Sequence, residues 1–387
     1  MSKTYRVRLL IETSRAFGRG LLRGICRYRS RHGPWQVEQE APVHVGPGSV
    51  AETRLGKSAL QVDGIIMRDR KGSLELLKKK VPVIFVAYLH EDVLGTHRIV
   101  TDDPAIARLA AAHLLERGFR HFAFVGYDSM VWSRRRRDGF VQAVNRAGFE
   151  CTAFVQARHR KERQWPRERT PLAEWLRGLP KPIGLLACND DRARQVVDAC
   201  LTAGLRIPEE IAIVGVDNDE FVCNLSNPPI SSIALDFEDA GYRAAQLLDR
   251  LMTGAKPRPQ TITPAALGVV TRRSSDITVI EDPLVARAVQ FIRANAHKPV
   301  YVPDLLREVG VSGRWLSSRF QQVLGCGVHE YVKKVHVAQI ERLLLETDCT
   351  LTEIAGRLGF PDASHVARYF RSVRGTNPLT LRSSRRK

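Results

Sequence analysis

Two hydrophobic patterns follow one another along the chain. Up to about residue 267, short apolar runs rich in Val and Ile alternate with longer segments in which apolar residues recur every three or four positions. The runs are VRLLIE (7–12), VDGIIM (62–67), PVIFVAY (82–88), FAFVG (122–126), IGLLAC (183–188) and IAIVGV (211–216). Strands that are apolar on both faces, with helices between them, are typical of covered parallel sheets. The pattern predicts an α/β fold, long enough for two lobes with ligand-binding residues at the strand ends.

The pattern changes after Leu267. A polar segment, GVVTRRSSDITVIEDP (268–283), follows, and beyond Pro283 the chain shows helical periodicity only. We place a domain boundary near Ser275, which gives an α/β domain over residues 1–275 and an all-α domain over residues 276–387.

The stretch TLTEIAGRLGFPDASHVARYF (350–370) predicts two short helices joined by a turn. Thr350 and Glu353 form a capping-box pattern, and Gly359 provides a left-handed stop. Between them, apolar residues recur at helical spacing at Leu351, Ile354, Ala355 and Leu358. A second helix is expected to begin at Asp362 and to bury Val366, Phe370 and Val373. Two such helices make a helix-turn-helix.

The same pattern occurs earlier in the chain. Val302, Leu305, Leu306, Val309 and Gly310 precede their counterparts by 49 positions, and Leu316, Phe320, Val323 and Gly325 precede theirs by 50. This indicates an internal duplication, with motifs at about 302–324 and 351–374. The segment between them, VHEYVKKVHVAQIERLLLE (328–346), is expected to form a rigid helical spacer.

The charge of the whole chain favours a polyanionic partner. The chain carries 60 Lys and Arg against 41 Asp and Glu, a net charge of +19, and neutralising phosphates is the general source of affinity for nucleic acid. The candidate DNA-binding residues on the second helix of each motif are Arg314, Trp315, Ser317 and Ser318, and Ser364, His365, Arg368 and Arg371. The alternative is an ordinary helical bundle. The basic runs at 133–138 and 158–169 are more typical of solvated surface.

The last hundred residues resemble the AraC-type transcription regulators. The resemblance lies in IAGRLGF (354–360) and RYFRSVRGTNPLTLR (368–382), with departures at Asn377 and Leu381 that concern packing of the last helix. The motifs GVDNDE (215–220), CNDDRAR (188–194) and RRSSD (272–276) are similar to those of a LacI/periplasmic-binding-like sensor of type I. The order of the domains resembles that of bacterial activators of xylose operons.

This resemblance implies an activator that binds promoter DNA and responds to a sugar, a pentose such as xylose. The cytoplasm is the expected location, because the sequence shows neither a membrane span nor a signal peptide. It also implies a homodimer joined through the sensor, and contact with RNA polymerase. Another sugar or a sugar acid remains open as the effector, because the run Arg134 to Arg137 departs from the regulators it resembles. Sugars are held by carboxylates, amides, an Arg donor and an aromatic face.

Six residues offer that sugar-binding chemistry near strand ends: Trp132, Arg136, Asn189, Asp190, Asp217 and Asn218. An Asp or Asn just after a strand is equally typical of a helix N-cap. No cofactor or metal is expected, because the seven cysteines are scattered without ligand spacing. No apolar run reaches the length of a membrane span, and the N-terminus does not read as a signal peptide.

A different class of protein remains as an alternative. GRGLLRG (18–24) follows the first strand, and Glu40 lies about 20 residues further on, which imitates a dinucleotide-binding fingerprint. The segment TSRAF separates these glycines from the strand, whereas a phosphate-binding turn follows its strand directly. The glycines thus have two interpretations. They belong either to a nucleotide-dependent α/β enzyme fused to a helical domain, or to a helix whose small residues let it pack closely on the sheet.

Overall fold

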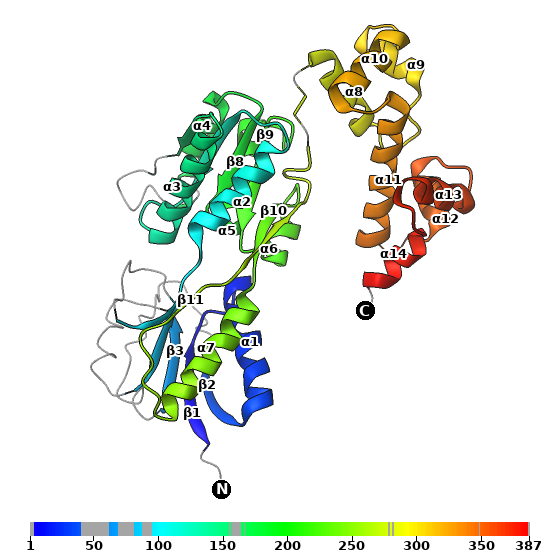
Figure 1. Cartoon of the computed structure of the whole chain (residues 1–387). Helices are drawn as coiled ribbons and strands as arrows, with labels where there is room; N and C mark the ends of the chain where they lie inside the picture. Colours follow the sequence, from blue (N-terminus) through cyan, green and yellow to red (C-terminus); the bar gives the residue numbers. More distant parts are fainter. Residues whose placement is uncertain are drawn as a thin grey trace. The chain divides into compact units, whose positions relative to one another are not determined.

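The computed structural model describes residues 4–39, 62–68, 81–86, 95–154, 156, 164–165, 167–277, 279–280, 282–347 and 349–385. The chain divides into two compact units, Met1–Thr278 and Val279–Lys387 (Figure 1). The first unit is α/β and the second is helical. Among the described residues, no helix has the length and apolar character needed to cross a membrane.

The first unit contains two six-stranded sheets, one in each of two lobes. In the first lobe the strand order is β11-β5-β4-β3-β1-β2, and all neighbouring strands are parallel. The bounds are β1 (Tyr5–Leu10), β2 (Trp35–Gln39), β3 (Gly64–Arg68), β4 (Val83–Val86), β5 (His97–Ile99) and β11 (Thr261–Ile262).

The second lobe has the order β12-β10-β9-β8-β6-β7, and only the pairing of β10 with β12 is antiparallel. Its strands are β6 (His121–Val125), β7 (Cys151–Ala153), β8 (Ile183–Ala187), β9 (Ile211–Val216), β10 (Ser231–Leu235) and β12 (Ala266–Val270). Every residue of β8 and β9 is buried, as their continuous apolar runs predict. The two-lobed α/β fold expected from the sequence is thus confirmed.

Helices surround both sheets. In the first lobe α1 (Ala16–His32) packs against α7 (Phe237–Met252). The second lobe has α2 (Asp103–Leu115), α3 (Val131–Arg146), α4 (Arg169–Gly178), α5 (Asp190–Ala203) and α6 (Glu220–Leu225). The chain passes between the lobes from β5 to α2, from β10 to α7 and from β11 to β12. These connections place the carboxyl ends of the strands of both sheets next to the junction of the lobes.

The glycines of GRGLLRG serve helix packing. A Cβ at Gly18 would lie 1.6 Å from the carbonyl oxygen of Glu12, and one at Gly24 would lie 1.9 Å from that of Glu238 on α7. A Cβ at Gly20 would lie 2.7 Å from the Cβ of Phe237. The glycines therefore allow α1 to approach α7 and the end of β1 closely. Glu40, the other half of the imitated fingerprint, lies outside the described residues.

The second unit consists of helices with two separate cores. Its helices are α8 (Pro283–Ala294), α9 (Val302–Val309), α10 (Gly313–Leu324), α11 (Val328–Glu346), α12 (Leu351–Leu358), α13 (Ala363–Arg374) and α14 (Pro378–Arg385). One core forms around Leu316 and Phe320, and the other around Val366 and Phe370. The long helix α11 contributes to both cores, which confirms its expected place between the two motifs.

The predicted caps of the second motif are present. Thr350 and Glu353 form a reciprocal capping box, with the Thr350 amide 2.7 Å from Glu353 Oε2. Gly359 adopts the left-handed conformation with φ of 71°, and Asp362 Oδ1 accepts a hydrogen bond from the amide of His365 at 2.7 Å. One expectation is wrong: Val373 keeps 36% of its surface exposed, as does its counterpart Val323. Both lie one turn beyond the buried Phe, where the helix has already left the core.

Candidate ligand site and nucleic-acid interface

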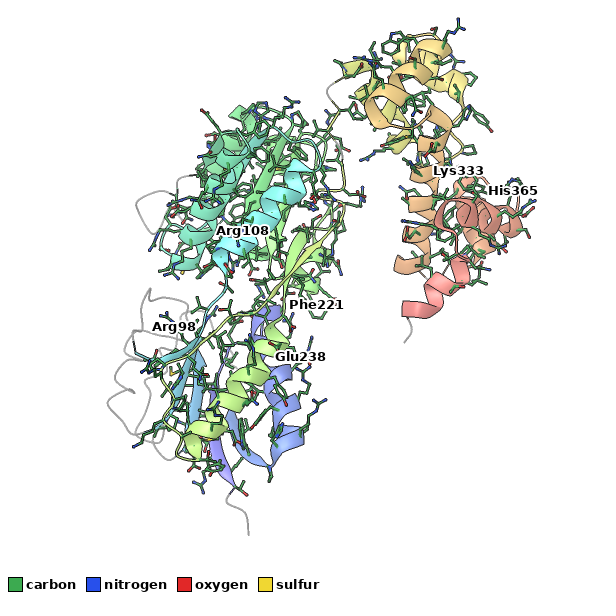
Figure 2. The ribbon with its side chains drawn as sticks, viewed as in Figure 1. Arg98, Arg108, Phe221, Glu238, Lys333 and His365 are labelled. Carbon is green, nitrogen blue, oxygen red and sulfur yellow. The ribbon has the colours of Figure 1, made fainter. Side chains whose placement is uncertain are left out.

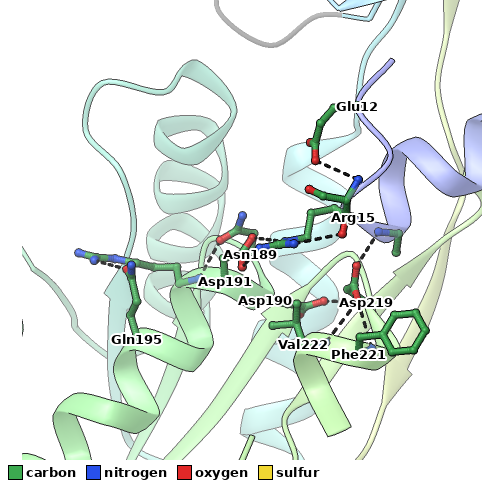
Figure 3. Close-up of polar contacts among 12 residues, drawn as sticks. Glu12, Arg15, Asn189, Asp190, Asp191, Gln195, Asp219, Phe221 and Val222 are labelled. Atoms are coloured by element: carbon green, nitrogen blue, oxygen red, sulfur yellow. Dashed lines mark hydrogen bonds and ion pairs between the residues drawn. The ribbon is translucent and has the colours of Figure 1, made fainter. Parts of the chain in front are cut away.

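Four side chains, two from each lobe, form direct bonds across the lobe junction. Arg15, just before α1, makes a bidentate ion pair with Asp191 on α5, at 2.8 and 2.9 Å (Figure 3). Asp219, just before α6, accepts hydrogen bonds from the amide of Ala16 at 2.6 Å and from Arg19 at 2.8 Å. We call Arg15, Arg19, Asp191 and Asp219 the clasp.

The interactions within the clasp favour the ionised forms of Asp219 and Arg15. Burial raises the pKa of the Asp219 carboxyl, but hydrogen bonds from Ala16, Val222 and Arg19 outweigh it and lower the pKa overall. The hydrogen bond to Asp191 raises the pKa of Arg15. Phe221, next to Asp219, is 68% exposed and lies under the Arg19 guanidinium at 5.3 Å (Figure 2). None of the clasp residues was predicted, because their pairing depends on how the lobes meet.

Arg136 is the central cation of the second lobe. Its side chain is 4% exposed. Nε donates to Asp103 Oδ1 at 3.0 Å and Nη1 to the carbonyl oxygen of Cys188 at 2.6 Å. Nη2 lies 3.9 Å from Asp217 Oδ1, and the guanidinium stands 5.0 Å from the ring centre of Trp132. Burial by itself would lower the pKa of the Arg136 guanidinium. The negative charges of Asp103 and Asp217 have the opposite and larger effect, so the net pKa is raised and the group stays charged.

Three of the six predicted ligand residues are therefore brought together: Trp132, Arg136 and Asp217. Of the basic run at 134–137, Arg136 is the buried member, while Arg135 is exposed and Arg137 pairs with Asp138. Asp103 was missed, because an Asp before Pro104 at a helix start has the pattern of a simple cap.

Asp217 lies in a loop with an unusual backbone. Asp217 has φ of 99° and Asn218 has φ of 50°, so two successive non-glycine residues occupy the left-handed region. The Asp217 side chain is 25% exposed. Burial raises the pKa of its carboxyl, and Arg136 opposes that shift. A partly desolvated carboxylate of this kind gains from hydroxyl donors, because each replaces the water that burial removed.

Asn189 and Asp190 have structural partners. Asn189 Oδ1 caps α5 by accepting a hydrogen bond from the amide of Arg192 at 3.0 Å. The Asp190 oxygens accept from the Asp219 amide at 2.7 Å and from Ser232 Oγ at 2.5 Å. Burial raises the pKa of Asp190 well above its usual value. Asp190 therefore supports the loop that carries Asp217, and Asn189 caps α5. Direct contact with a ligand stays a prediction for both residues, as it does for Asn218.

The first lobe contributes groups that sequence reasoning missed. Arg68, at the end of β3, pairs with Glu12 at 3.4 Å and stands 6.0 Å from the ring centre of Phe17. Its charge also acts on Asp217 in the second lobe by lowering the pKa of that carboxyl. Glu12 and Phe17 follow β1, at the same sheet edge. The position of Glu12 just after an apolar strand is the sequence signal that could have identified it as a candidate site residue.

Five arginines at and around this junction face a carboxylate. Arg15 pairs with Asp191, Arg19 with Asp219, and Arg68 with Glu12. Arg136 pairs with Asp103, and the fully buried Arg192 pairs with Glu168 at 2.6 Å. Each of these five guanidinium groups therefore lies beside a negative charge. Among the described residues no group of His, Cys, Asp and Glu has the arrangement of a metal centre.

The first helix-turn-helix presents its predicted residues to solvent. Arg314, Trp315, Ser317 and Ser318 lie in the early turns of α10 and are exposed, ahead of the buried Phe320. Ser312 Oγ caps the helix by accepting a hydrogen bond from the amide of Trp315 at 3.3 Å. Trp315 is 37% exposed, a large apolar surface to leave in water.

The second motif also exposes its candidates. Ser364, His365, Arg368 and Arg371 are exposed on α13 (His365 is labelled in Figure 2). Arg368 Nη2 lies 3.3 Å from His365 Nδ1, one turn earlier on the helix. Arg374, near the helix end, is held by Glu341 on α11. Arg368 and Arg371 form no ion pair with the described residues, so their charges are available to phosphate.

Comparisons with known proteins match both halves of this description. A model of the periplasmic binding protein-like domain matches residues 111–275, and a model of a helix-turn-helix domain matches residues 305–384. The chain is therefore a transcription regulator that joins a periplasmic-binding-protein-like sensor to an AraC-type helix-turn-helix domain, and the enzyme alternative is set aside.

Full-length relatives have the same arrangement. The chain is similar to the xylose operon regulatory protein of Escherichia coli K12, with 28% identity over 98% of this chain and 97% of the relative. It is 29% identical to the protein of the same name from Haemophilus influenzae, over 98% of each. It also resembles the solved structure of the xylose-binding transcription activator xylR, with a TM-score of 0.76, 27% identity and 99% coverage of both chains. The resemblance inferred from sequence motifs is thus confirmed.

Proposed function

We propose that this chain is a cytoplasmic, sugar-responsive activator whose effector is a neutral sugar, with D-xylose as the first candidate. The relatives are named for the xylose operon, and the sensor offers a partly desolvated carboxylate, Asp217, beside the aromatic Trp132. A pyranose ring presents hydroxyl donors to the former and a C–H face to the latter.

The observation that carries the choice of a neutral sugar is the pairing of charges at the lobe junction. Arg136 already faces Asp103 and Asp217, and Arg68 faces Glu12. A sugar acid would have to compete with these carboxylates for each guanidinium and would lie near Asp217 itself. Like charges in a desolvated site are costly, so a hydroxyl-rich neutral ligand suits the site better.

A thermal-shift panel tests this assignment. D-xylose, other pentoses, hexoses and sugar acids are added in turn to the full-length protein, since a ligand that binds only the folded state raises Tm. We expect a neutral pentose to give the largest rise. A sugar acid that stabilises the protein more than every neutral sugar would show the assignment of effector class to be wrong.

Asp217→Ala localises the response. Losing an acceptor for a desolvated sugar costs about 1–3 kcal/mol for each unmade hydrogen bond, so the sugar-induced shift should disappear while the free variant stays folded. Asp138→Ala is the matched control, because Asp138 is exposed on the same lobe and pairs with Arg137. An unstable Asp217→Ala variant that still responds to sugar would assign Asp217 a structural role.

The output is proposed to be promoter occupancy through both helix-turn-helix motifs. A homodimer joined through the sensor, and contact with RNA polymerase, complete the proposed activator. Dimerisation is measured by sedimentation of the full chain, and a polymerase contact by transcription in vitro from a promoter that carries the selected site.

A further inference from the structure

The segment that leaves the sensor unit is built into the second lobe. Ser274 is fully buried, and its Oγ donates to the carbonyl oxygen of Ile213 at 2.6 Å and accepts from the amide of Ser231 at 2.9 Å. Its carbonyl oxygen accepts from the amide of Ile213 at 2.7 Å. Ser274 therefore bonds to β9, which ends at the loop of Asp217, and to β10 beside it.

The next residue is fixed by α2. Ser275 Oγ lies 2.8 Å from His113 Nε2, and the Ser275 carbonyl oxygen accepts from Arg117 Nε at 2.9 Å. Asp103, which holds Arg136, lies at the other end of the same helix. The sensor unit ends at Thr278 and the helical unit begins at Val279, four residues after Ser275. The exit of the chain from the sensor is thus held within the lobe, close to the point where the second unit begins.

Arg272 joins this exit directly to the candidate ligand loop. Its Nη2 donates to Asn218 Oδ1 at 2.9 Å, and its Nη1 donates to the carbonyl oxygen of Ile230 at 3.0 Å. Its backbone amide donates to Ser231 Oγ at 2.7 Å, and its carbonyl oxygen accepts from the same hydroxyl at 2.8 Å. One residue therefore ties together the loop after β9, the start of β10 and the exit segment.

The loop at the far end of this connection is strained. Asp217 and Asn218 both have positive φ, 99° and 50°, a backbone conformation that is unfavourable for a residue other than glycine. The conformation is held by the Asp217 amide, which donates to the Ile233 carbonyl oxygen at 3.0 Å, and by the Asn218 amide, which donates to Ser232 Oγ at 3.0 Å. Because strain and restraints oppose each other here, a ligand that bonds to Asp217 changes the balance between loop conformations.

We propose that Arg272 is a positioning residue that transmits the state of the Asp217–Asn218 loop to the exit segment, 272–275, and so to the DNA-binding unit. The proposal rests on the proposed function, in which Asp217 contacts the effector. The fork of the guanidinium suits this role, because its two nitrogens bond to the loop and to the strand at the same time. When the Asp217–Asn218 loop rearranges around the ligand, the Arg272 guanidinium moves with it and displaces the backbone of the exit segment, to which Arg272 belongs.

The test uses the full-length protein and two variants. Arg272→Met removes the fork and keeps a side chain of similar length, and Arg273→Met removes a neighbouring exposed charge as the matched control. For each protein the Kd for a duplex selected from random-sequence DNA is measured without sugar and with saturating D-xylose. Saturation is checked by titrating D-xylose into the same protein in a calorimeter.

The readout is the ratio of the two DNA Kd values, which is the coupling between the sites. A coupled regulator changes affinity by about 5- to 150-fold, and we expect such a ratio for the wild type and for Arg273→Met. In Arg272→Met the ratio should fall to within about twofold of unity while D-xylose still binds, and by reciprocity DNA should no longer change the affinity for D-xylose. Arg272→Lys, with a single point of donation, should be intermediate.

Several outcomes would overturn the proposal. If Arg272→Met has the same ratio of DNA Kd values as the wild type, Arg272 only stabilises the lobe and does not transmit the state of the loop. A wild type that binds no sugar of the thermal-shift panel refutes the proposed function, and the coupling falls with it. If Arg272→Met does not fold, hydrogen exchange on the wild type decides: D-xylose should slow exchange of the amides in residues 271–277, and unchanged exchange there would contradict the proposal.

Discussion

The two helix-turn-helix motifs share one scaffold and differ in their outer surfaces. Gly310 and Gly359 end the first helices with φ of 76° and 71°, and Phe320 and Phe370 are both fully buried. The early exposed turns of α10 carry Arg314 and Trp315, while those of α13 carry Ser364 and His365, followed by Arg368 and Arg371. The duplication has therefore kept the core and changed the residues that face a partner.

The difference suggests a division of labour. Arg314 lies at the N-terminal end of α10, where recognition helices approach base edges, and Arg can make a bidentate contact with guanine. Arg368 and Arg371 lie further along α13, where contact with the phosphate backbone is geometrically easier. We expect the first motif to discriminate sequence and the second to set position and general affinity.

The largest expected effect concerns whether the motifs are independent. Phe320→Ala and Phe370→Ala each empty a fully buried site, at a cost of about 3–5 kcal/mol. Because the two cores are separate clusters, each variant should unfold its own motif first. Hydrogen exchange resolved by helix is the measurement. Equal loss of protection in α9 and α10 on replacing Phe370 would show a single cooperative core.

Arg314→Ala sharpens the comparison at the level of bases. The loss should be about 1–3 kcal/mol on the selected duplex, with preference relaxed at one base pair. Binding isotherms on selected and scrambled duplexes measure it. Arg307→Ala is the matched control, because Arg307 is exposed on α9 and forms an ion pair with Asp304 on the same helix. A loss of the same size on scrambled DNA would assign Arg314 to the backbone.

Arg368→Ala should behave in the opposite way. Removing one phosphate contact should weaken selected and scrambled duplexes alike and reduce the salt slope by about one unit. The exposed Arg357, on α12, provides the control variant Arg357→Ala. Titrations at several salt concentrations give the slopes. A loss confined to the selected duplex would remove the division of labour between the motifs.

The smallest expected effect is a pH dependence of stability that is confined to the core of the second motif. His336, on α11, is 6% exposed, lies against Phe360 and Tyr369 of the second motif, and has Nε2 3.1 Å from the Lys298 carbonyl oxygen. Burial lowers the pKa of His336 below 6.5, and the bond to Lys298 opposes this only in part. Below that pH the unfolded chain binds a proton that the folded core excludes.

Stability of the second motif should therefore be full above pH 6.5 and fall as the pH decreases, by less than about 1.4 kcal/mol per pH unit. His336→Gln, which can keep the bond to Lys298, should lose this dependence. Denaturant unfolding between about pH 7.5 and about pH 5, a range that brackets the reference pKa of 6.5, followed by helix-resolved exchange at the end points, measures it. An identical pH dependence in the variant would exclude His336 as its source.

Local signals explain why the helical unit was predictable from sequence. Its caps, stops and helical spacing each involve residues within one or two turns, and the duplication repeats them. The exception, Val373, shows the limit: the apolar spacing continues past the core, but Val373 keeps 36% of its surface exposed. Spacing indicates which face is apolar and does not show where the packing ends.

The sensor was predictable only in part. The continuous apolar strands were found, whereas short or partly exposed strands such as β5 and β11 were not, because a run like His97–Ile99 carries no apolar pattern. At the site, Arg136 and Asp217 were found from motifs. Asp103 and Arg68 were missed because their partners, Arg136 and Glu12, lie 33 and 56 positions away in the chain. The clasp was missed because only the meeting of the two lobes brings its residues together.

The central claim is that a sugar bound beside Asp217 controls DNA binding by the duplicated motifs. The most direct measurement is the DNA Kd of the full chain with and without D-xylose, for the wild type and for Asp217→Ala. We expect D-xylose to change the wild-type Kd by about 5- to 150-fold. Asp217→Ala should keep the sugar-free Kd and show no change on adding D-xylose. A variant that responds like the wild type, or a sugar-bound wild type with unchanged DNA affinity, would contradict the account.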